Sequence, residues 1–466
     1  MATHDDISVS EKLSNGEGLT RILADYAVHA EFTDLPDEVR RQSIRGFMNW
    51  MGCALGGSRE GAVQIAKEVA LETGAKPVAS IIGHAERTDV ASAAFINSMS
   101  SSILAFDDAH LPSLAHPTGP VSAALLALSE ARCVSGEDFI TAYSLGVEII
   151  CRLSNALIHE PLTLNGSFYI NGLTAPIGVA AAVGRILKLD ARRMRWALGL
   201  AASQGSGFRA VHGTMNSHFR PAHATRAGVN AALLAAKGFD SSDDSLEADK
   251  GFFEVYSPGS EPAIAAGELG ACFEGLNVTF KPYPCGLVTH SIIDACFDIR
   301  KKLPSYESIS KICVRANPIA FKLNGKRKPT TELECHISLY HWVAVTLLRG
   351  RAGLTETRQT CFNDPQVVTL RDRVEGISDP LMRQQEAVVE ITCHDGTVLH
   401  CRVVEPRGSL GRPMTDSELD AKFFDQAGLV ISQETAEALW RACSRLACLQ
   451  DVGREVMAVL PGSLGH

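Results

Sequence analysis

The amino-acid sequence predicts a mainly α fold, with a large all-helical domain built from both termini and a smaller inserted α+β lid domain. Three observations lead to this prediction. Helical patterns follow one another through about the first 270 residues, short β-rich runs begin near Leu276, and helical patterns return after about residue 406. We therefore expect residues 1–272 and 407–466 to form the helical domain and residues 273–406 to form the lid domain.

The helical domain is predicted from repeated start and stop signals. Segment 35–57 begins with acidic residues, continues with arginines and ends with a glycine pair, as a capped helix does. Comparable segments are 59–74, 89–106, 120–131, 136–157, 172–186, 190–207 and 223–239. They are rich in Ala, Gly and Ser, and small residues let helices approach closely, so we expect a tightly packed bundle.

The lid domain is predicted from short runs of Val, Ile, Phe and Thr that alternate with helical patterns. The predicted strands are 276–284, 308–318 and the two halves of 387–406, which flank Asp395-Gly396, a strong hairpin signal. The predicted helices are 289–303, 331–350 and 364–374. Two further helices, 413–428 and 432–450, are expected to rejoin the first domain, so that a cleft forms between the domains.

Composition excludes several classes of protein. The 466 residues include 44 Lys and Arg against 53 Asp and Glu, a net charge of −9, which argues against a nucleic-acid partner. The 13 cysteines form no CxxC pair, which predicts free thiols and a cytoplasmic location. The first 18 residues lack the features of a secretory signal, and no apolar run reaches the roughly 20 residues that a membrane span needs, so we expect no membrane partner.

The densest group of chemically active residues lies in the run FDDAHLPSLAHPTGP. It contains Asp107, Asp108, His110 and His116 in a predicted loop, where an aspartate can orient an imidazole for proton transfer. Alternatively, the aspartates cap the next helix and His116 fills a polar gap. A zinc or iron site is a third interpretation, but no HExxH or CxxC spacing supports it, and we predict no metal.

A second group comprises His212, His218, Arg220, His223 and Arg226, just before and within the start of a predicted helix. Backbone N–H groups and the helix dipole favour anions there, so this group suits a ligand that carries carboxylates. The alternative is a solvated, partly basic turn.

A third group surrounds Lys281 in the run FKPYPCGLVTH. A lysine in a cleft of low dielectric constant can act as a base or stabilise negative charge. Cys285 has no neighbouring histidine partner in the sequence, which argues against a thiol nucleophile. A basic loop, 326–328, either binds a substrate carboxylate or is solvated. The sequence contains no GxGxxG, GxSxG or Walker pattern.

In this order, these segments resemble the MmgE/PrpD family. The matching stretches are FDDAHLPSLAHP, DARRMRWALGLAASQGSG, KPYPCGLVTH, TELECHISLYHWVAVTLLRG, FNDPQVV and RPMTDSELDAKF, which together span nearly the whole chain. The resemblance implies a homodimer without a cofactor, whose site for small di- or tricarboxylates lies between a helical domain and an α+β lid. It places Asp108, His116 and Lys281 on family signature positions.

Other positions that serve the dehydratases and decarboxylases of this family differ here. Ala105 replaces an acidic residue, Ala109 a threonine, Tyr169 a histidine and Ser217 a lysine of a Thr-Lys-Pro-Leu-His-like turn. Elimination of water needs an acid as well as a base, and decarboxylation needs a proton donor. An epimerase needs one acid/base group on each face of one carbon and cations that stabilise an enolate-like intermediate.

The changed positions therefore favour an isomerase that epimerises an iminodisuccinate-type dicarboxylate. Lys281 and Tyr169 would be its acid/base groups, and His116 with Asp108 would orient or relay. The expected substrate-binding residues are Asp107, His110, His218, Arg220 and His223. The alternatives are a lyase of the 2-methylcitrate dehydratase or cis-aconitate decarboxylase type, and a catalytically silent protein that binds carboxylates.

Overall fold

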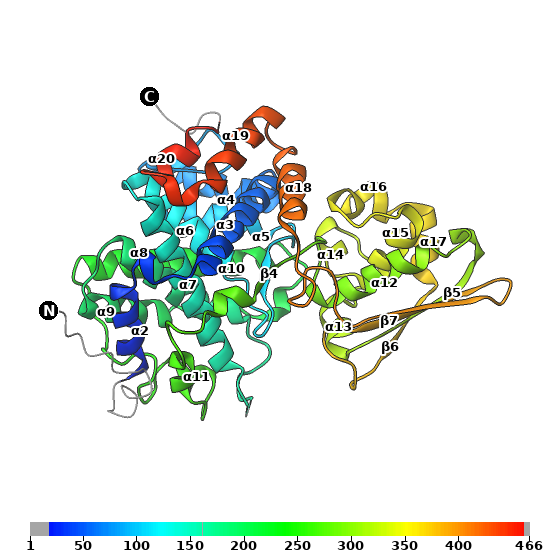
Figure 1. Ribbon diagram of the computed structural model, residues 1–466, viewed down its shortest axis with the longest axis horizontal. Coiled ribbons are helices and arrows are strands. Elements are labelled where there is room, and N and C mark those ends of the chain that lie inside the picture. The colour runs from blue at the N-terminus through cyan, green and yellow to red at the C-terminus, as the bar shows by residue number, and fades with distance from the viewer. Residues whose placement is uncertain (1–17, 161, 461–466) are drawn as a thin grey trace.

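Most of the chain is helical, and the predicted mainly α fold with a smaller α+β region is confirmed (Figure 1). The computed structural model describes residues 18–160 and 162–460. Within them, helices from both ends of the chain form a helical body, and residues from the middle form an α+β part beside it. None of the described helices is both long and apolar enough to cross a lipid bilayer.

The helical body contains the helices α2 to α11 and α18 to α20. They are α2 (Leu19–His29), α3 (Asp37–Gly57), α4 (Gly61–Glu72), α5 (Val90–Ser102), α6 (Thr118–Ala131), α7 (Gly136–Leu157), α8 (Ile170–Ile186), α9 (Ala191–Ala202), α10 (Asn216–Ala236), α11 (Phe252–Tyr256), α18 (Asp416–Ala427), α19 (Gln433–Ser444) and α20 (Val452–Met457). The larger of its buried hydrophobic clusters runs from Leu19 to Leu460 and includes Phe47, Trp50 and Phe139, and a smaller one includes Val63 and Ile96.

Small residues allow the central helices α7, α8 and α10 to pack closely. A Cβ atom on Gly178 of α8 would lie 2.5 Å from the carbonyl oxygen of Gly146 of α7, and one on Gly228 of α10 would lie 2.5 Å from that of Pro176. Larger side chains would push these helices apart. This is the tight packing that the Ala- and Gly-rich segments predict.

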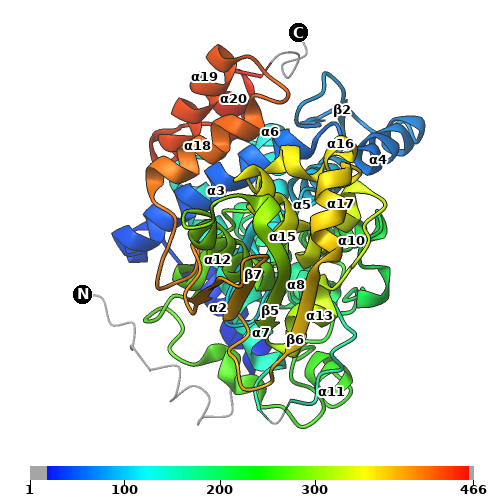
Figure 2. The same ribbon diagram turned by 90° about the vertical axis from the view of Figure 1, so that its right-hand side faces the viewer.

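The α+β part contains a four-stranded sheet with the order β6-β5-β7-β8. Its strands are β5 (Ile309–Ala316), β6 (Val374–Ser378), β7 (Ala387–Cys393) and β8 (Val398–Val403). Its helices are α12 (His290–Arg300), α13 (Pro318–Asn324), α14 (Glu332–Cys335), α15 (Leu339–Arg349), α16 (Gln359–Phe362) and α17 (Pro365–Asp372). β5 pairs with β6 in parallel and with β7 antiparallel. Helix α12 contacts β7 and β8, and α15 contacts β6, over a second hydrophobic core (Figure 2).

The predicted hairpin at Asp395-Gly396 is confirmed: it joins β7 to β8, and Gly396 has a positive φ of 86°. The segment 331–350 differs from its prediction, because it forms two helices rather than one. Ser338 ends the break between them by accepting a hydrogen bond from the backbone N–H of His341, and this break places His336 at the boundary of the two parts.

A short antiparallel ladder joins the two parts of the chain. β3 (Asp108–His110) pairs with β4 (Val278–Phe280), so the strand predicted within 276–284 pairs with the helical body and not with the four-stranded sheet. Phe273 and Val278 accordingly belong to the first core, and the second core begins at Tyr283. The exact limits of the two domains stay a prediction. The remaining pair, β1 (Ala79–Ser80) and β2 (Arg87–Thr88), is a small antiparallel ladder.

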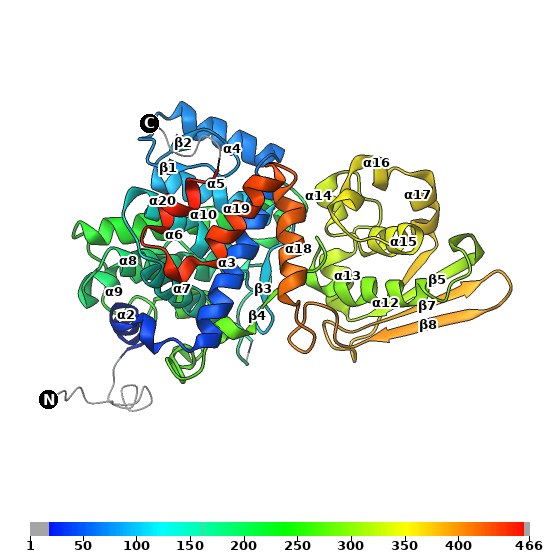
Figure 3. The ribbon, with the colours of Figure 1, turned by 45° about the horizontal axis from the view of Figure 1, so that its top comes forward.

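Helix α18 returns the chain to the helical body beside the α+β part (Figure 3). It packs against α3, where a Cβ on Gly52 would lie only 3.2 Å from the Cα of Phe423. The close approach brings Lys422, the neighbour of Phe423, to the ends of β3 and β4.

Candidate active site

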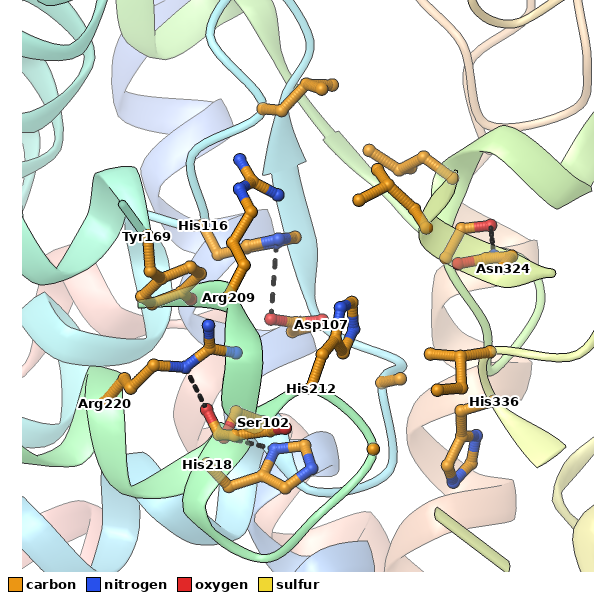
Figure 4. Close-up of a pocket in the computed structure, with 18 of the residues that line it drawn as sticks. Ser102, Asp107, His116, Tyr169, Arg209, His212, His218, Arg220, Asn324 and His336 are labelled. Carbon is orange, nitrogen blue, oxygen red and sulfur yellow. Dashed lines mark hydrogen bonds and ion pairs between the residues drawn. The ribbon is translucent and has the colours of Figure 1, made fainter. Parts of the chain in front are cut away.

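A cleft of about 170 Å³ lies between the helical body and the α+β part (Figure 4). One wall comes from the end of α5, the loop before α6, the start of α8 and the start of α10. The other comes from the segment after β4, the end of α13 and the break between α14 and α15. Its polar lining residues are Ser102, Asp107, His116, Tyr169, Arg209, His212, Ser217, His218, Arg220, Lys281, Asn324 and His336.

Asp107 and Lys281 form a nearly buried ion pair in this cleft. The Nζ of Lys281 lies 2.5 Å from Oδ1 of Asp107, and the backbone N–H of Lys281 donates to the carbonyl of Asp107 at 3.2 Å. Burial opposes ionisation of Asp107, but the positive charge of Lys281 holds its pKa below the usual value. The pair therefore keeps a charged ammonium at the cleft surface.

His116 is held with one ring nitrogen free. Its Nδ1 lies 2.6 Å from the carbonyl oxygen of Asp108, which only accepts, so Nδ1 carries the hydrogen and Nε2 is left as the acceptor of the neutral ring. The side chain of Asn171, on α8, accepts from the backbone N–H of His116 at 2.9 Å and donates to its carbonyl at 2.7 Å. Burial lowers the pKa of His116, which favours this neutral form.

Two arginines and Tyr169 form a cationic wall. The guanidinium of Arg220 lies 4.1 Å from the centre of the Tyr169 ring, and its Nη1 donates to the carbonyl of Phe208 at 3.1 Å. Arg209 donates from Nε to the carbonyl of Phe168 at 3.2 Å. Burial raises the pKa of Tyr169 well above 10 despite the opposing charge of Arg220, so this phenol is a hydrogen donor rather than a base. The role of Tyr169 as an acid/base group stays a prediction, and this environment favours the acid role over the base role.

Three further histidines line the cleft in the neutral form. Burial and neighbouring positive charges lower the pKa of His212 to about 4, of His218 to about 3 and of His336 to about 4. His218 lies with Nδ1 3.3 Å from the hydroxyl of Ser102, and His336 with Nδ1 2.5 Å from the carbonyl of Pro284. They add hydrogen-bonding groups to the cleft without adding charge.

Six of the predicted site residues line the cleft and three do not. Those that line it are Asp107, His116, Tyr169, His218, Arg220 and Lys281. Asp108 lies behind the cleft, where its Oδ2 accepts from the backbone N–H of Thr118 and burial raises its pKa. His110 is fully buried between Ser113, at 2.7 Å, and Glu274, at 3.0 Å. His223 stacks on Phe219, 5.5 Å away between ring centres.

The placements of these three residues follow from the local geometry. Along a strand, successive side chains point to opposite faces, so Asp107 faces the cleft while Asp108 faces the helical body. His223 lies one turn of α10 beyond Phe219, on a face of the helix that does not line the cleft. Asp108, His110 and His223 are therefore not part of the cleft lining, and their roles in binding or catalysis stay predictions.

The other residues of the predicted groups have local partners. Lys326 pairs with Glu334, and Arg327 lies over the ring of Tyr340, so the basic loop bonds within the α+β part. Burial raises the pKa of Cys285, which argues further against a thiol nucleophile. In residues 18–160 and 162–460, no three His, Cys, Asp or Glu side chains are grouped so that they could hold a metal ion.

The cleft also contains residues that the sequence did not single out, namely Arg209, Asn324 and His336. His212 belongs to the second predicted group but was not among the expected substrate-binding residues. Arg209 lies three residues before His212, so extending the second group toward the N-terminus would have included it. His336 was hidden because the segment 331–350 was predicted as one unbroken helix. With Lys281, Arg209 and Arg220 opposed by the single carboxylate of Asp107, the lining carries excess positive charge.

Family models match most of this chain. The MmgE/PrpD N-terminal domain matches residues 21–265, and the MmgE/PrpD C-terminal domain matches residues 283–446. The chain belongs to the MmgE/PrpD family. This places the cleft between the segments that the two family domains cover.

Relatives of this MmgE/PrpD chain include cis-aconitate decarboxylases of animals and a fungus. The human enzyme is 26% identical over 435 residues, which cover 90% of this chain and 89% of the relative. The mouse enzyme is 27% identical and covers 77% and 76%, and that of Aspergillus terreus is 24% identical and covers 91% and 92%. These relatives are lyases, and this finding overturns the sequence-based prediction of an isomerase. The substitutions at Ala105, Ala109, Tyr169 and Ser217 were a weaker guide to reaction class than likeness along the whole chain.

Proposed function

We propose that this protein is a lyase that decarboxylates a small tricarboxylate of the cis-aconitate class. The observation that carries the proposal is its likeness, along about nine-tenths of the chain, to cis-aconitate decarboxylases. The cleft supports it, because Arg209, Arg220 and Lys281 suit a substrate with several carboxylates.

Decarboxylation of such a substrate breaks the bond between a carbon and its carboxylate, and the electron pair stays on the carbon. In cis-aconitate the pair spreads through the adjacent double bond toward another carboxylate, and CO2 leaves. One proton must then be added to a carbon. Cations that face the carboxylate on which charge grows stabilise this intermediate, and Arg209 and Arg220 are suited to that role.

Lys281 is the proposed proton donor. Its ammonium is nearly buried and is held by Asp107, so it is fixed in position and charged before the substrate binds. His116 is proposed to accept a hydrogen bond through Nε2, or to take up a proton from solvent at Nε2 and pass it to Lys281 after turnover. Tyr169, as a protonated phenol beside Arg220, is a second donor to the substrate.

The absence of a lysine at Ser217 does not argue against this mechanism, because Arg220 lies nearby. The run Arg220-Pro221-Ala222-His223 has the same order as the Lys-Pro-Leu-His turn. Arg220 therefore offers a cation in place of the lysine, whereas Ser217 bonds to the carbonyl of Val211. A charged contact between Arg220 and a substrate carboxylate is therefore compatible with a decarboxylase.

The test is to incubate the purified protein with cis-aconitate in deuterated water and follow CO2 and the organic product by mass spectrometry and NMR. We expect one CO2 per product molecule and one deuterium at the protonated carbon. Production of a new alkene from 2-methylcitrate without CO2 would instead indicate a dehydratase. Binding of cis-aconitate without turnover, or no binding at all, would contradict the proposal. The homodimer and the cytoplasmic location stay predictions, the first to be checked by light scattering.

A further inference from the structure

Lys422, on α18, lies outside the cleft lining but is bonded to the backbone of two cleft segments. Its side chain is buried, with 6% of the residue exposed. Its Nζ donates to the carbonyl of Phe106 at 2.6 Å, to the carbonyl of Lys281 at 2.9 Å and to Oδ1 of Asn49 at 2.7 Å. It also lies 4.3 Å from the centre of the Phe106 ring.

These contacts fix the spacing of the two segments that carry the ion pair. Phe106 is the neighbour of Asp107, and the second carbonyl belongs to Lys281 itself. Both lie just beyond the β3–β4 ladder, where a single backbone hydrogen bond, from Lys281 to Asp107, continues the pairing. A side chain that bonds to both carbonyls therefore holds the ladder together at the point where the chains enter the cleft.

The number of donors matches the number of acceptors. An ammonium has three N–H groups, and Lys422 has three acceptors, whereas a neutral amine has only two N–H groups. Loss of the proton would leave one buried acceptor unpaired, which is costly.

We propose that Lys422 is a positioning residue: through the carbonyls of Phe106 and Lys281 it fixes the separation of Asp107 and Lys281 and thereby their reactivity. The expected effect on kcat rests on the proposed function. The effect on the separation of Asp107 and Lys281 does not depend on it. It also explains how the C-terminal segment contributes to a cleft that it does not line.

The first test is Lys422→Met, which keeps much of the length and apolar character of the side chain and removes the ammonium. A shift of about 1 Å in a catalytic group can cost on the order of a hundredfold in rate, so we expect kcat for cis-aconitate to fall about 100-fold while KM changes little. The matched control is Phe423→Leu, on the same helix but packed against α3. It is expected to lower the melting temperature and to leave kcat unchanged below that temperature.

The second test is the pH profile, compared with that of Lys422→Arg. Burial lowers the pKa of Lys422 to about 8, and the groups facing it are Cys53 from α3, Asp107 and Asp108 before and in β3, and Lys281 after β4. We expect kcat of the natural protein to decline above about pH 8. In Lys422→Arg, whose guanidinium stays charged, that decline should move to higher pH.

The third test does not need turnover. A crystal structure of Lys422→Met is expected to show a larger separation between Nζ of Lys281 and Oδ1 of Asp107. An unchanged separation together with an unchanged kcat in Lys422→Met would overturn the inference, even if the melting temperature fell. If the natural protein does not decarboxylate cis-aconitate, the proposed function fails, and the crystallographic separation still decides whether Lys422 positions the pair.

Discussion

Lys281 and Asp107 are separated by 174 residues in the sequence, and their side chains meet at 2.5 Å in the cleft. They are the first two residues beyond the β3–β4 ladder, so the pairing of two three-residue strands determines where the charged groups meet. This ladder joins the loop before α6 to the segment that leads into the α+β part. The ion pair of Asp107 and Lys281 thus lies where the two parts of the fold meet.

Asp107→Asn should reduce turnover strongly without preventing folding. The amide is the same size as the carboxylate, but it removes the negative charge of Asp107. That charge holds Lys281 through Oδ1, and Oδ2 lies 3.5 Å from Nδ1 of His116. Removing a positioned acid/base group costs about 10²- to 10⁴-fold in rate, and we expect a loss toward the lower end because Lys281 remains. Steady-state kinetics on cis-aconitate measure this loss of rate. Lys281→Met, which lacks the proposed proton donor, is the reference. Equal rates for Asp107→Asn and the natural protein would show that the ion pair is not part of the mechanism.

Asn171→Leu should lower kcat through His116. The side chain of Asn171 bonds to both backbone polar groups of His116, and leucine of similar size can bond to neither. We expect about a tenfold to hundredfold fall in kcat. The matched control is Thr174→Val, one turn along α8, which removes a buried hydroxyl bonded to Ser154 and does not touch His116. If both variants lost activity in proportion to their loss of stability, the positioning role of Asn171 would be wrong.

Local patterns were sufficient for most of the fold, and the reasons are visible at particular residues. The Asp395-Gly396 hairpin depends on a turn that only a few residues adopt, and the helical body depends on caps and on small residues such as Gly178 and Gly228. The pairing of β4 with β3 depends on a contact between segments far apart in sequence, so the sequence predicted a strand here without indicating its partner.

The site was predicted in part for the same reasons. Lys281, His116 and Arg220 were identified because each stands in an unusual local setting, and all three line the cleft. Asp108 was preferred to Asp107 because the sequence does not reveal which of two adjacent carboxylates faces inward until the strand is known. The partners of His110 and the burial of Tyr169 come from segments distant in sequence, and neither is encoded locally.

Acidification should destabilise this protein before most carboxylates are protonated. Burial lowers the pKa of His212 and His336 to about 4 and that of His218 to about 3, whereas an exposed histidine titrates near 6.5. Between about pH 6.5 and pH 4 the unfolded chain therefore binds protons that the folded chain does not, and the free energy of unfolding falls as the pH falls.

Urea denaturation at pH 7.5, 6.0 and 5.0 measures this dependence. His212→Gln should be less sensitive to pH in this window, because glutamine does not titrate in either state. The matched control is His29→Gln, at the exposed end of α2 and distant from the cleft residues, which should keep the pH dependence of the natural protein. An identical slope in His212→Gln and the natural protein would contradict the assignment of a neutral, buried His212.

Arg220 should determine how well the protein binds substrates with several carboxylates. Its guanidinium is held by Tyr169 and the carbonyl of Phe208, so it is oriented before the ligand arrives and a carboxylate can bond to the N–H groups that remain. A hydrogen bond between charged groups contributes about 1.5 to 3 kcal/mol, so we expect Arg220→Met to raise the Kd for tricarballylate, an unreactive tricarboxylate, by about tenfold or more.

Arg220→Lys should recover part of the affinity, because it keeps the charge but not the planar geometry. Calorimetry measures these affinities directly. The matched control is Arg226→Met, on the same helix. The guanidinium of Arg226 lies 4.7 Å from the ring centre of Phe95, and Arg226 does not line the cleft. Equal weakening in Arg220→Met and Arg226→Met would indicate a general effect of the charge of α10, whereas weakening confined to Arg220→Met places one carboxylate of the ligand against Arg220.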